Sequence, residues 1–243
     1  MKAILLAAGV ARRLYPLTFD APKCLLKVRD RPIVDYQLQA LMVQGVRDVV
    51  MTVGYYRERI MAHVQQVFPD LGFTFVVNEH FFETNTAYSL YLCRKTLQSS
   101  DILLMNADVL YPVELVKRVM SSRHANVLAV EVKKCGREEV KVISSADDKL
   151  VAVGKELIQE NSLGEFIGVA KFSQAFGRDL SESLGHLIDA GGKADYFEAA
   201  VHPLLARRDV FHVDVTDLPC IEIDFEEDLV RANELAGSSW FQS

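Results

Sequence analysis

The sequence has little cysteine, no long hydrophobic run and no excess of positive charge. Its four cysteines (Cys24, Cys93, Cys135 and Cys220) form no C-x-x-C pair, which predicts reduced, packed thiols and no disulfide framework or zinc site. No apolar stretch approaches the roughly 18–20 residues of a membrane-spanning helix. The net charge of −6 comes without a basic stripe. We therefore expect neither a membrane nor a nucleic acid as partner.

The apolar segment at the start of the chain raises the question of an export signal. Residues 3–11 are apolar and end in small residues, but only Lys2 precedes them and two arginines follow. The pattern then continues as that of an ordinary globular protein, with half of the residues hydrophobic and a quarter charged. We predict a cytoplasmic protein in which this segment is the first strand.

Strand-like and helix-like segments alternate through the first half of the chain. In chain order we expect strand 2–7, helix 33–45, strand 48–54, helix 56–67, strand 73–78, helix 85–97, strand 101–108 and a helix after Pro112. Short connections between alternating strands and helices predict a mostly parallel sheet that is covered on both faces.

After about residue 126, strands follow one another with only turns between them. We expect strands at 126–132, 139–145, 149–157 and 164–172, helices at about 173–191 and 195–207, strands at 210–216 and 220–224, and a helix at 225–235. The predicted fold class is α/β, with a Rossmann-like, three-layer, mixed but mostly parallel sheet and a β-rich second portion. We predict a single domain, 1–243, whose tail, 237–243, is either frayed or a contact in a homo-oligomer.

The turn after the first strand is a candidate phosphate-binding loop. Ligands of parallel sheets bind at the carboxyl ends of strands, where residues 8–13 are expected. Small residues allow backbone N–H groups to approach phosphates closely, and Arg13 and Lys23 add positive charge. A tight turn with two solvated arginines is the alternative.

Two aspartates are candidate metal ligands. Asp108 ends an apolar strand at the same sheet edge, where a carboxylate commonly anchors Mg²⁺; a position at a helix N-terminus is the alternative. Asp224 closes a late strand, and Glu227 three residues later makes a helix-capping role equally plausible. Glu222 alternates with Asp224 and should face the same way.

These segments together resemble a known family. The stretch "LAAGVARRLYPLTFDAPKCLLKV" resembles the opening signature of the nucleotidyltransferases that couple an NTP to a sugar phosphate or small alcohol phosphate. The segments "NAD", "VGKEL", "GEFIGVAKF" and "EID" follow in the family's order. "NTAYSLYL" and "DLPCIEIDFEEDLVRANEL" look most like the phosphocholine cytidylyltransferase branch, whose relatives also use inositol phosphate or aminoethylphosphonate.

The resemblance implies a nucleotide-binding part, 1–125, an acceptor-binding part, 126–236, CTP or another NTP as one substrate, and Mg²⁺ as cofactor. The implied roles are nucleotide binding for Ala7, Ala8, Gly9, Asn85 and Thr86, catalysis for Lys23, Arg13 and Asp108, metal binding for Asp108 and Asp224, and acceptor binding for Lys155 and Gly168. Simple helix capping is the alternative for Asn85 and Thr86, and a solvated hairpin lysine is the alternative for Lys155.

The acceptor stays open at this point. A choline head would need aromatic faces and nearby carboxylates, which Tyr196, Glu198, Glu165 and Glu222 can supply, whereas we expect Phe197 to pack in the core. A polyol or sugar phosphate would use Glu165 and Glu222 to accept hydroxyl hydrogen bonds, and an aminophosphonate would need only the carboxylates.

The sequence departs from the family pattern in its loop. The family usually has Gly-x-Gly-Thr/Ser-Arg where this chain reads "GVARR", so Ala11 stands at a glycine position and Arg12 at the position of a small hydroxyl residue. Cys220 replaces a frequent tryptophan. Besides CTP-dependent transfer, two readings remain: a UTP- or dTTP-dependent sugar-1-phosphate enzyme, and a catalytically silent nucleotide-sensing subunit.

Overall fold

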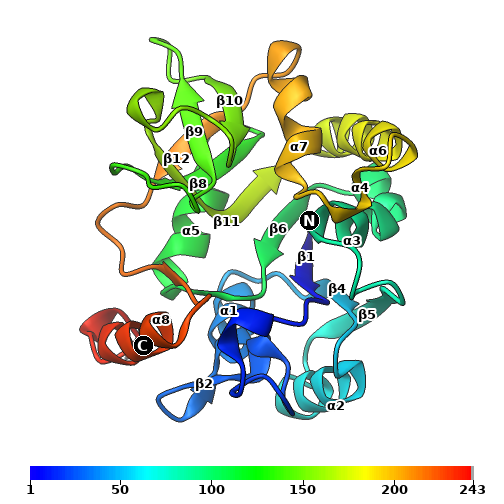
Figure 1. Ribbon diagram of the computed structural model, residues 1–243, viewed down its shortest axis with the longest axis vertical. Coiled ribbons are helices and arrows are strands. Elements are labelled where there is room, and N and C mark those ends of the chain that lie inside the picture. Colours follow the sequence, from blue (N-terminus) through cyan, green and yellow to red (C-terminus); the bar gives the residue numbers. More distant parts are fainter. Residues whose placement is uncertain (242–243) are drawn as a thin grey trace.

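A central sheet of nine strands organises the part of the chain that the structure describes, residues 1–241 of this computed structural model (Figure 1). The strand order is β10-β9-β11-β6-β1-β4-β5, with β8 beside β11 and β12 beside β8. The strands are β1 (Lys2–Ala7), β4 (Asp48–Val53), β5 (Gly72–Val77), β6 (Ile102–Asn106), β8 (Val127–Glu131), β9 (Lys141–Ser144), β10 (Leu150–Gly154), β11 (Gly164–Phe172) and β12 (Phe211–Asp214). Strands β1, β4, β5 and β6 pair in parallel, whereas β11 runs antiparallel to β6, β8 and β9.

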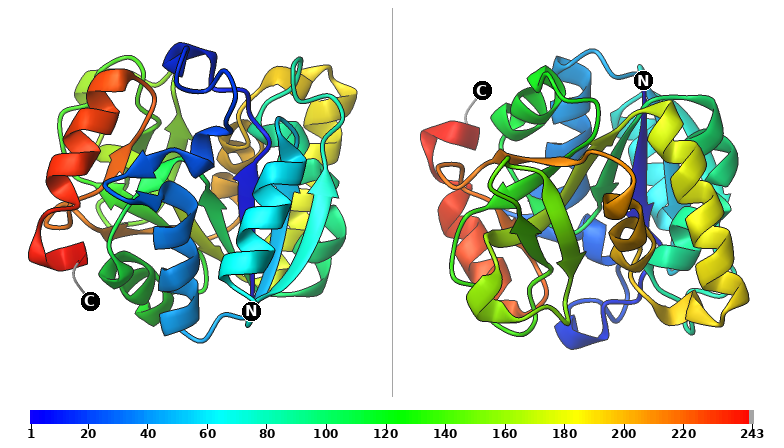
Figure 2. Two further views of the ribbon diagram at one scale, coloured as in Figure 1. Left: turned by 90° about the horizontal axis from the view of Figure 1, so that it is seen from below. Right: turned by 90° about the horizontal axis from the view of Figure 1, so that it is seen from above.

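Helices cover both faces of this sheet, as the two views of Figure 2 show. Residues of β1 alternate between two hydrophobic clusters, with Leu5 in one and Ile4 in the other. The helices are α1 (Ile33–Val43), α2 (Arg57–Val67), α3 (Thr86–Leu92), α4 (Arg94–Ser99), α5 (Val113–Ser121), α6 (Gln174–Asp189), α7 (Glu198–Val201) and α8 (Glu226–Leu235). Helices α1, α2 and α5 pack on the Leu5 face, and α3, α4 and α6 pack on the Ile4 face. The predicted three-layer α/β class is therefore confirmed.

Two predicted helices differ from the observed ones. The helix expected at 85–97 breaks at Cys93, which ends α3 and precedes α4, although the side chains of Leu90, Cys93 and Leu97 stay buried as expected. The helix expected at 195–207 is the four-residue α7 followed by a 3-10 turn, because Pro203 lacks the N–H that a continuing α-helix needs.

Two short two-stranded sheets and a small third hydrophobic cluster complete the described part of the molecule. Strand β2 (Lys27–Val28) pairs with β3 (Arg31–Pro32), and β7 (Val109–Leu110) pairs with β13 (Ile221–Glu222). Helix α8 packs into the third hydrophobic cluster.

The predicted tail is partly ordered. The ring of Phe241 lies edge-on to Tyr36 at 5.7 Å between centroids, so fraying is the wrong prediction for the tail as far as Phe241. Gln242 and Ser243 lie outside the described residues, and the oligomer contact stays a prediction. Among residues 1–241, no helix combines the length and the apolar character needed to cross a membrane.

The order of the strands locates a ligand-binding edge. From β1 the chain proceeds to β4 and β5 on one side, then crosses to β6 on the other side. Ala7 of β1 is in register with Val53, and Leu6 with Asn106, so these strands end at one level. The loops after β1 and β6 thus meet at a topological switch point, where open α/β sheets bind ligands.

Candidate active site

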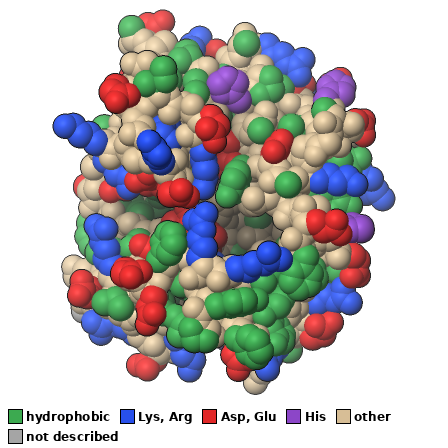
Figure 3. Space-filling model, in the orientation of Figure 1, with side chains coloured by type: hydrophobic (Ala, Val, Ile, Leu, Met, Phe, Trp, Pro, Cys, Tyr) green, Lys and Arg blue, Asp and Glu red, His purple; other side chains and the backbone are tan. Residues whose placement is uncertain are grey.

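A cleft of about 370 Å³ opens at this switch point. It lies between the candidate phosphate-binding loop of residues 8–13 (the signature loop), the end of β6 and the segments around α7 and β13. Figure 3 shows it as a hollow near the middle of the face, with charged side chains along its edge. The cleft brings together most of the residues that the sequence predicted for the site: Ala7, Gly9, Arg13, Lys23, Asn85, Thr86, Asp108, Lys155, Tyr196, Glu198, Glu222 and Asp224.

The signature loop is held by neighbouring backbone. The carbonyl oxygen of Ala8 accepts a hydrogen bond from the N–H of Tyr55 at 3.2 Å. The adjacent Gly54 has no room for a side chain, because a Cβ there would lie 2.7 Å from that same Ala8 oxygen. Ala8 is itself buried and does not line the cleft, so its contribution is to anchor the loop.

Ala11 adopts the left-handed conformation, with φ 52° and ψ 53°. Its carbonyl oxygen accepts a hydrogen bond of 2.9 Å from the hydroxyl of the buried Thr18, which helps to hold this conformation. The loop therefore keeps the backbone shape for which glycine would be the unstrained residue.

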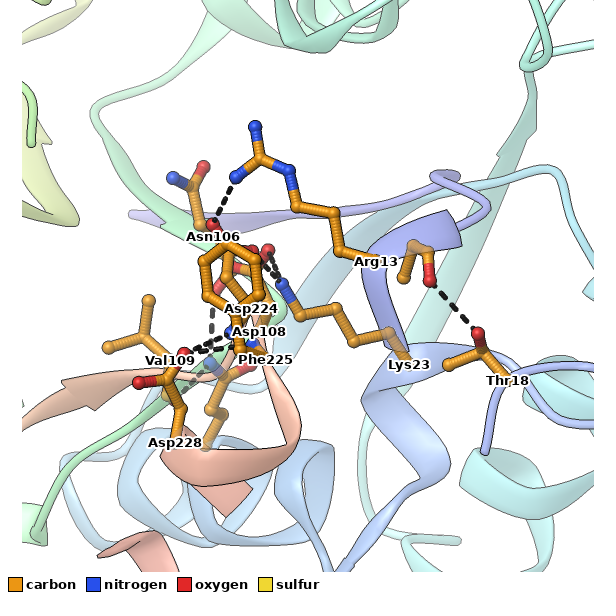
Figure 4. A network of polar contacts seen from close by, with 11 residues as sticks. Arg13, Thr18, Lys23, Asn106, Asp108, Val109, Asp224, Phe225 and Asp228 are labelled. Carbon is orange, nitrogen blue, oxygen red and sulfur yellow. Dashed lines mark hydrogen bonds and ion pairs between the residues drawn. The ribbon is translucent and has the colours of Figure 1, made fainter. Parts of the chain in front are cut away.

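Lys23 lies at the floor of the cleft between two aspartates. Its Nζ donates to Asp108 Oδ2 at 2.9 Å and to Asp224 Oδ1 at 2.6 Å (Figure 4). Burial alone would lower the pKa of Lys23, whose side chain is only 11% exposed, but the two carboxylates outweigh burial and raise the pKa. Lys23 in turn lowers the pKa of Asp224 against the opposing effect of burial. The cluster is thus an ammonium group held between the side chains of two aspartates.

Arg13 approaches the same cluster from the opening of the cleft. Its guanidinium lies 3.4 Å from Asp224 and 3.5 Å from Glu138. The ring of Phe225 lies beneath it, 5.4 Å from the guanidinium carbon to the centroid. Both predicted cations of the loop therefore face the Asp224 carboxylate.

A buried glutamine, which sequence reasoning missed, positions Asp108. Gln37 of α1 donates from Nε2 to the carbonyl oxygens of Asn106 at 2.9 Å and Val109 at 2.8 Å, on either side of Asp108. The available signal was its place in α1, because Gln37 interrupts the apolar face that includes Val34. An uncharged polar residue on such a face needs buried partners.

The capping role considered for Asp224 is wrong. Phe225 is the N-cap of α8, and Asp228, not Glu227, accepts from the backbone N–H groups of Asp224 at 2.9 Å and Phe225 at 2.8 Å. The Asp224 side chain is therefore left for Lys23 and Arg13. At the other capping candidate, Asn85 does cap α3 by accepting from the N–H of Thr86 at 2.8 Å, while it also lines the cleft.

Three carboxylates form a group that suits a hard metal ion. Asp108, Glu222 and Asp224 each offer an oxygen within 4.8 Å of the others. Asp108 Oδ1 is buried and has no hydrogen-bond partner among residues 1–241. Desolvation, followed by repulsion from Asp108 and Asp224, raises the pKa of Glu222 to about 8. Oxygen donors and like-charge crowding both fit Mg²⁺. Glu222 thus joins the two predicted ligands.

The far wall of the cleft carries Lys155, Tyr196 and Glu198. The Nζ of Lys155 lies over the ring of Tyr196, 4.5 Å from its centroid. Glu198 is 4% exposed, and its Oε2 has no hydrogen-bond partner in the described part of the chain. Burial raises the pKa of Glu198 to about 7, against smaller opposing effects of a backbone hydrogen bond and Lys155. Phe197 is buried against Phe166, which confirms its predicted place in the core.

Two predicted acceptor residues lie outside the cleft. Glu165 pairs with Lys133 at 2.6 Å and lines a neighbouring cavity, which shares Glu222 and Asp224 with the cleft. Gly168 has φ 77°, and a Cβ there would lie 2.9 Å from the side-chain nitrogen of Asn106. Close packing against Asn106, the last residue of β6, therefore explains the glycine at this position.

Sequence reasoning also missed an aromatic side of the cleft. Phe81 and Phe82 line it from the loop between β5 and α3. No periodic pattern marks this loop, and only its two adjacent aromatic residues before the Asn85 cap gave a signal.

Comparison with known proteins decides the family. Residues 2–140, more than half of the chain, match the family described as Nucleotidyl transferase. The chain belongs to this family. It is a nucleotidyltransferase, which transfers a nucleotidyl group from an NTP to a small phosphorylated acceptor.

Similar proteins include cytidylyltransferases. The chain is 24% identical to CTP:phosphoglutamine cytidylyltransferase of Campylobacter jejuni over 191 residues, which cover 72% of this chain and 74% of that protein. It is 36% identical to choline-phosphate cytidylyltransferase of Streptococcus pneumoniae over 103 residues, 42% of this chain and 43% of the relative. The solved CTP:phosphocholine cytidylyltransferase of S. pneumoniae superimposes with a TM-score of 0.79 at 23% identity, covering 96% of this chain and 98% of that one. This likeness establishes the nucleotidyltransferase fold for nearly the whole chain.

Proposed function

We propose that this nucleotidyltransferase transfers CMP from CTP to a small phosphate or phosphonate, with Mg²⁺ as cofactor and pyrophosphate as second product. The observation that carries the proposal is the Lys23–Asp108–Asp224 cluster at the floor of the cleft, beside the signature loop. The similarity to two CTP-dependent enzymes supports CTP as the nucleotide. Phosphocholine, aminoethylphosphonate and inositol phosphate are the acceptors that we consider.

The proposed reaction needs no general base. An acceptor phosphate is already a nucleophile at neutral pH, and its oxygen forms a bond to the α-phosphorus of CTP while the bond to the β-phosphate oxygen breaks. The task of the protein is to bring two anions together and to offset their charge. Lys23 suits this role because its raised pKa keeps it protonated, so it acts as a cation and takes up no proton.

Asp108, Glu222 and Asp224 are the residues that would hold Mg²⁺. Bound there, the ion would supply positive charge that offsets the negative charge of the reacting phosphates. Lys23 and Arg13 already contact the same carboxylates, so protein cations and metal would share one acidic cluster.

The far wall of the cleft favours an acceptor with a cationic or hydrogen-bonding end. Glu198 has a buried oxygen without a partner in the described chain, and a buried carboxyl group is stabilised by a donor or a positive charge. Tyr196 adds an aromatic face and Lys155 a cation for the acceptor phosphate. We therefore expect the acceptor to carry an ammonium group, as phosphocholine and aminoethylphosphonate do, and not to be a sugar phosphate.

Pyrophosphate release tests the proposal directly. Four NTPs are each combined, with Mg²⁺, with phosphocholine, aminoethylphosphonate, inositol 1-phosphate and glucose 1-phosphate, and a parallel series contains excess EDTA. We expect turnover with CTP and one of the first three acceptors, and none with EDTA. Turnover confined to UTP or dTTP with glucose 1-phosphate would replace the proposal by the sugar-nucleotide alternative. CTP binding without turnover of any pair would favour a sensing role.

A further inference from the structure

Two consecutive arginines of the signature loop, Arg12 and Arg13, each stack on an exposed phenylalanine. The guanidinium carbon of Arg12 lies 5.8 Å from the ring centroid of Phe82, and that of Arg13 lies 5.4 Å from the ring centroid of Phe225. The phenylalanines are 59% and 44% exposed, and all four residues lie at the cleft or its neighbouring cavity.

The two arginines differ in their charged partners. Arg13 pairs with Asp224 and Glu138. Arg12 forms no ion pair with any residue of the described chain, and Phe82 is its side-chain contact. Lys23, the remaining cation beside the loop, is neutralised by Asp108 and Asp224. Arg12 is therefore the cation of this loop whose charge no carboxylate of residues 1–241 balances.

The loop that carries Phe82 is anchored by hydrogen bonds of its neighbouring residues. The buried Asn78 donates to the hydroxyls of Thr84 at 3.0 Å and Ser89 at 3.1 Å, and accepts from the N–H of His80 at 2.9 Å. Phe81 packs against Phe82 with 4.4 Å between ring centroids. Arg12 thus stacks on an aromatic pair that lines the same cleft as the phosphate-binding loop.

We propose that Arg12 binds the β- and γ-phosphates of the nucleotide and holds the pyrophosphate as it leaves, with Phe82 as its platform. A guanidinium binds phosphate oxygens in a bidentate manner and stacks on aromatic rings, which a lysine does less well. Arg12 adds a cation to Arg13 and Lys23, the two that the sequence predicted for the phosphates. The inference rests on the proposed function, since it assigns a phosphate ligand in the same cleft.

Calorimetric binding with Mg²⁺ tests this assignment without turnover. CTP, CMP and inorganic pyrophosphate are titrated into the wild-type chain, Arg12→Ser, Phe82→Leu and a control, Arg59→Ser. Arg59 is an exposed arginine that likewise stacks on a ring, Tyr56 at 4.9 Å, but lies outside the cleft. We expect Arg12→Ser to lower the affinity for CTP and for pyrophosphate about tenfold. Its affinity for CMP should be unchanged, because CMP lacks the two outer phosphates. Phe82→Leu should show the same pattern to a smaller extent.

Three outcomes overturn the inference. The first is CTP binding by Arg12→Ser as tight as that of the wild-type chain, and the second is an equal loss of CTP and CMP affinity in Arg12→Ser. The third is a loss of CTP affinity in Arg59→Ser as large as that in Arg12→Ser. A wild-type chain that binds CTP but turns over no acceptor would overturn the proposed function and leave this assignment to be decided by the binding series. A wild-type chain that binds no NTP would overturn both. Far-UV circular dichroism confirms that each variant is folded.

Discussion

At the scale of single residues, Lys23 carries the positive charge on which the proposed reaction depends most. It lies between Asp108 and Asp224, so it competes with any cation that these carboxylates bind. We expect Lys23→Ala to lower kcat at least about a hundredfold, because a cation at the reacting phosphates is lost. The same change should raise the affinity of the nucleotide-free protein for Mg²⁺, measured calorimetrically.

The exposed Lys27, four residues along the chain, provides the control, since Lys27→Ala should change neither quantity. Full turnover in Lys23→Ala would remove Lys23 from the mechanism. Unchanged Mg²⁺ affinity would show instead that the metal does not share its carboxylates.

Ala11 carries backbone strain that a glycine would not. Its left-handed conformation costs an alanine about 1–2 kcal/mol, and the greater freedom of glycine in the unfolded chain offsets about 0.4–1 kcal/mol of the gain. We therefore expect Ala11→Gly to raise the free energy of unfolding, measured in urea titrations, by up to about 1.6 kcal/mol. A decrease would mean that the Cβ of Ala11 makes contacts that outweigh the strain.

Glu198 should make stability depend on pH. Its pKa of about 7 in the folded protein exceeds the ordinary value of 4.5, so the folded state retains a proton that the unfolded state releases. Stability is then fully present below pH 4.5 and falls as pH rises towards 7, by roughly 3 kcal/mol.

Denaturant titrations of Glu198→Gln should show this pH dependence reduced. Glu182→Gln, at an exposed position of α6, should retain it. Parallel pH profiles for wild type and Glu198→Gln would contradict a buried neutral carboxyl group. Other groups of the cleft with a shifted pKa, among them Lys23, Glu222 and Asp224, are the same in both proteins and cancel in the comparison.

At the scale of elements, periodicity predicted which segments are helices and strands but not where neighbours interrupt them. The start of α3 is hydrogen-bonded to a distant segment. The N–H of Asn85 donates to the carbonyl oxygen of Lys193 at 2.9 Å, and the N–H of Ala87 donates to that of Asp195 at 3.1 Å. Pro203 shortens the 195–207 segment to α7, whereas these backbone contacts help to decide where α3 begins. They follow from tertiary packing, which the local pattern of residues 85–97 does not contain.

The turn between β4 and α2 supports the signature loop, so a change there should affect binding. Gly54→Ala would place a Cβ 2.7 Å from Ala8 O and from the Cβ of Phe81. We expect a loss of about 1–3 kcal/mol in the free energy of unfolding and weaker CTP binding, because the loop must shift. The matched control is Gly185→Ala in α6, where the nearest atom is 4.0 Å away and alanine favours the helix. Equal behaviour of the two variants would remove Gly54 from this role.

At the scale of the whole molecule, the sequence predicted which segments form the site. It did not predict which way some side chains point, or which residues of neighbouring helices and loops reach the site. Asp108 and Asp224 were expected together because both were candidate metal ligands at strand ends, and Lys23 contacts both of them in the structure. The orientation of a strand decides which neighbour a side chain meets, so Glu165 turns to Lys133 instead of the cleft. Gln37 and Phe82 reach the site from a helix and a loop that carry no recognised motif.

The molecule as a whole makes one site from segments that are far apart in the chain. Lys23 and Asp108 are 85 positions apart, and Lys23 and Asp224 are 201 positions apart. The site therefore exists only in the folded sheet, with the nucleotide-binding and acceptor-binding parts proposed for 1–125 and 126–236 facing each other across the cleft. Transfer between two substrates requires this arrangement, because each part supplies cations or carboxylates to one reaction centre.

The most direct test of nucleotidyl transfer at this centre is ³¹P NMR of the wild-type chain with Mg²⁺, CTP and the acceptor selected by the pyrophosphate assay, beside Lys23→Ala. We predict two coupled resonances of a CMP-linked acceptor together with pyrophosphate in the wild-type reaction, and neither in the variant. Orthophosphate with CDP would show hydrolysis in place of transfer. Either that result or equal product formation by Lys23→Ala would contradict the account.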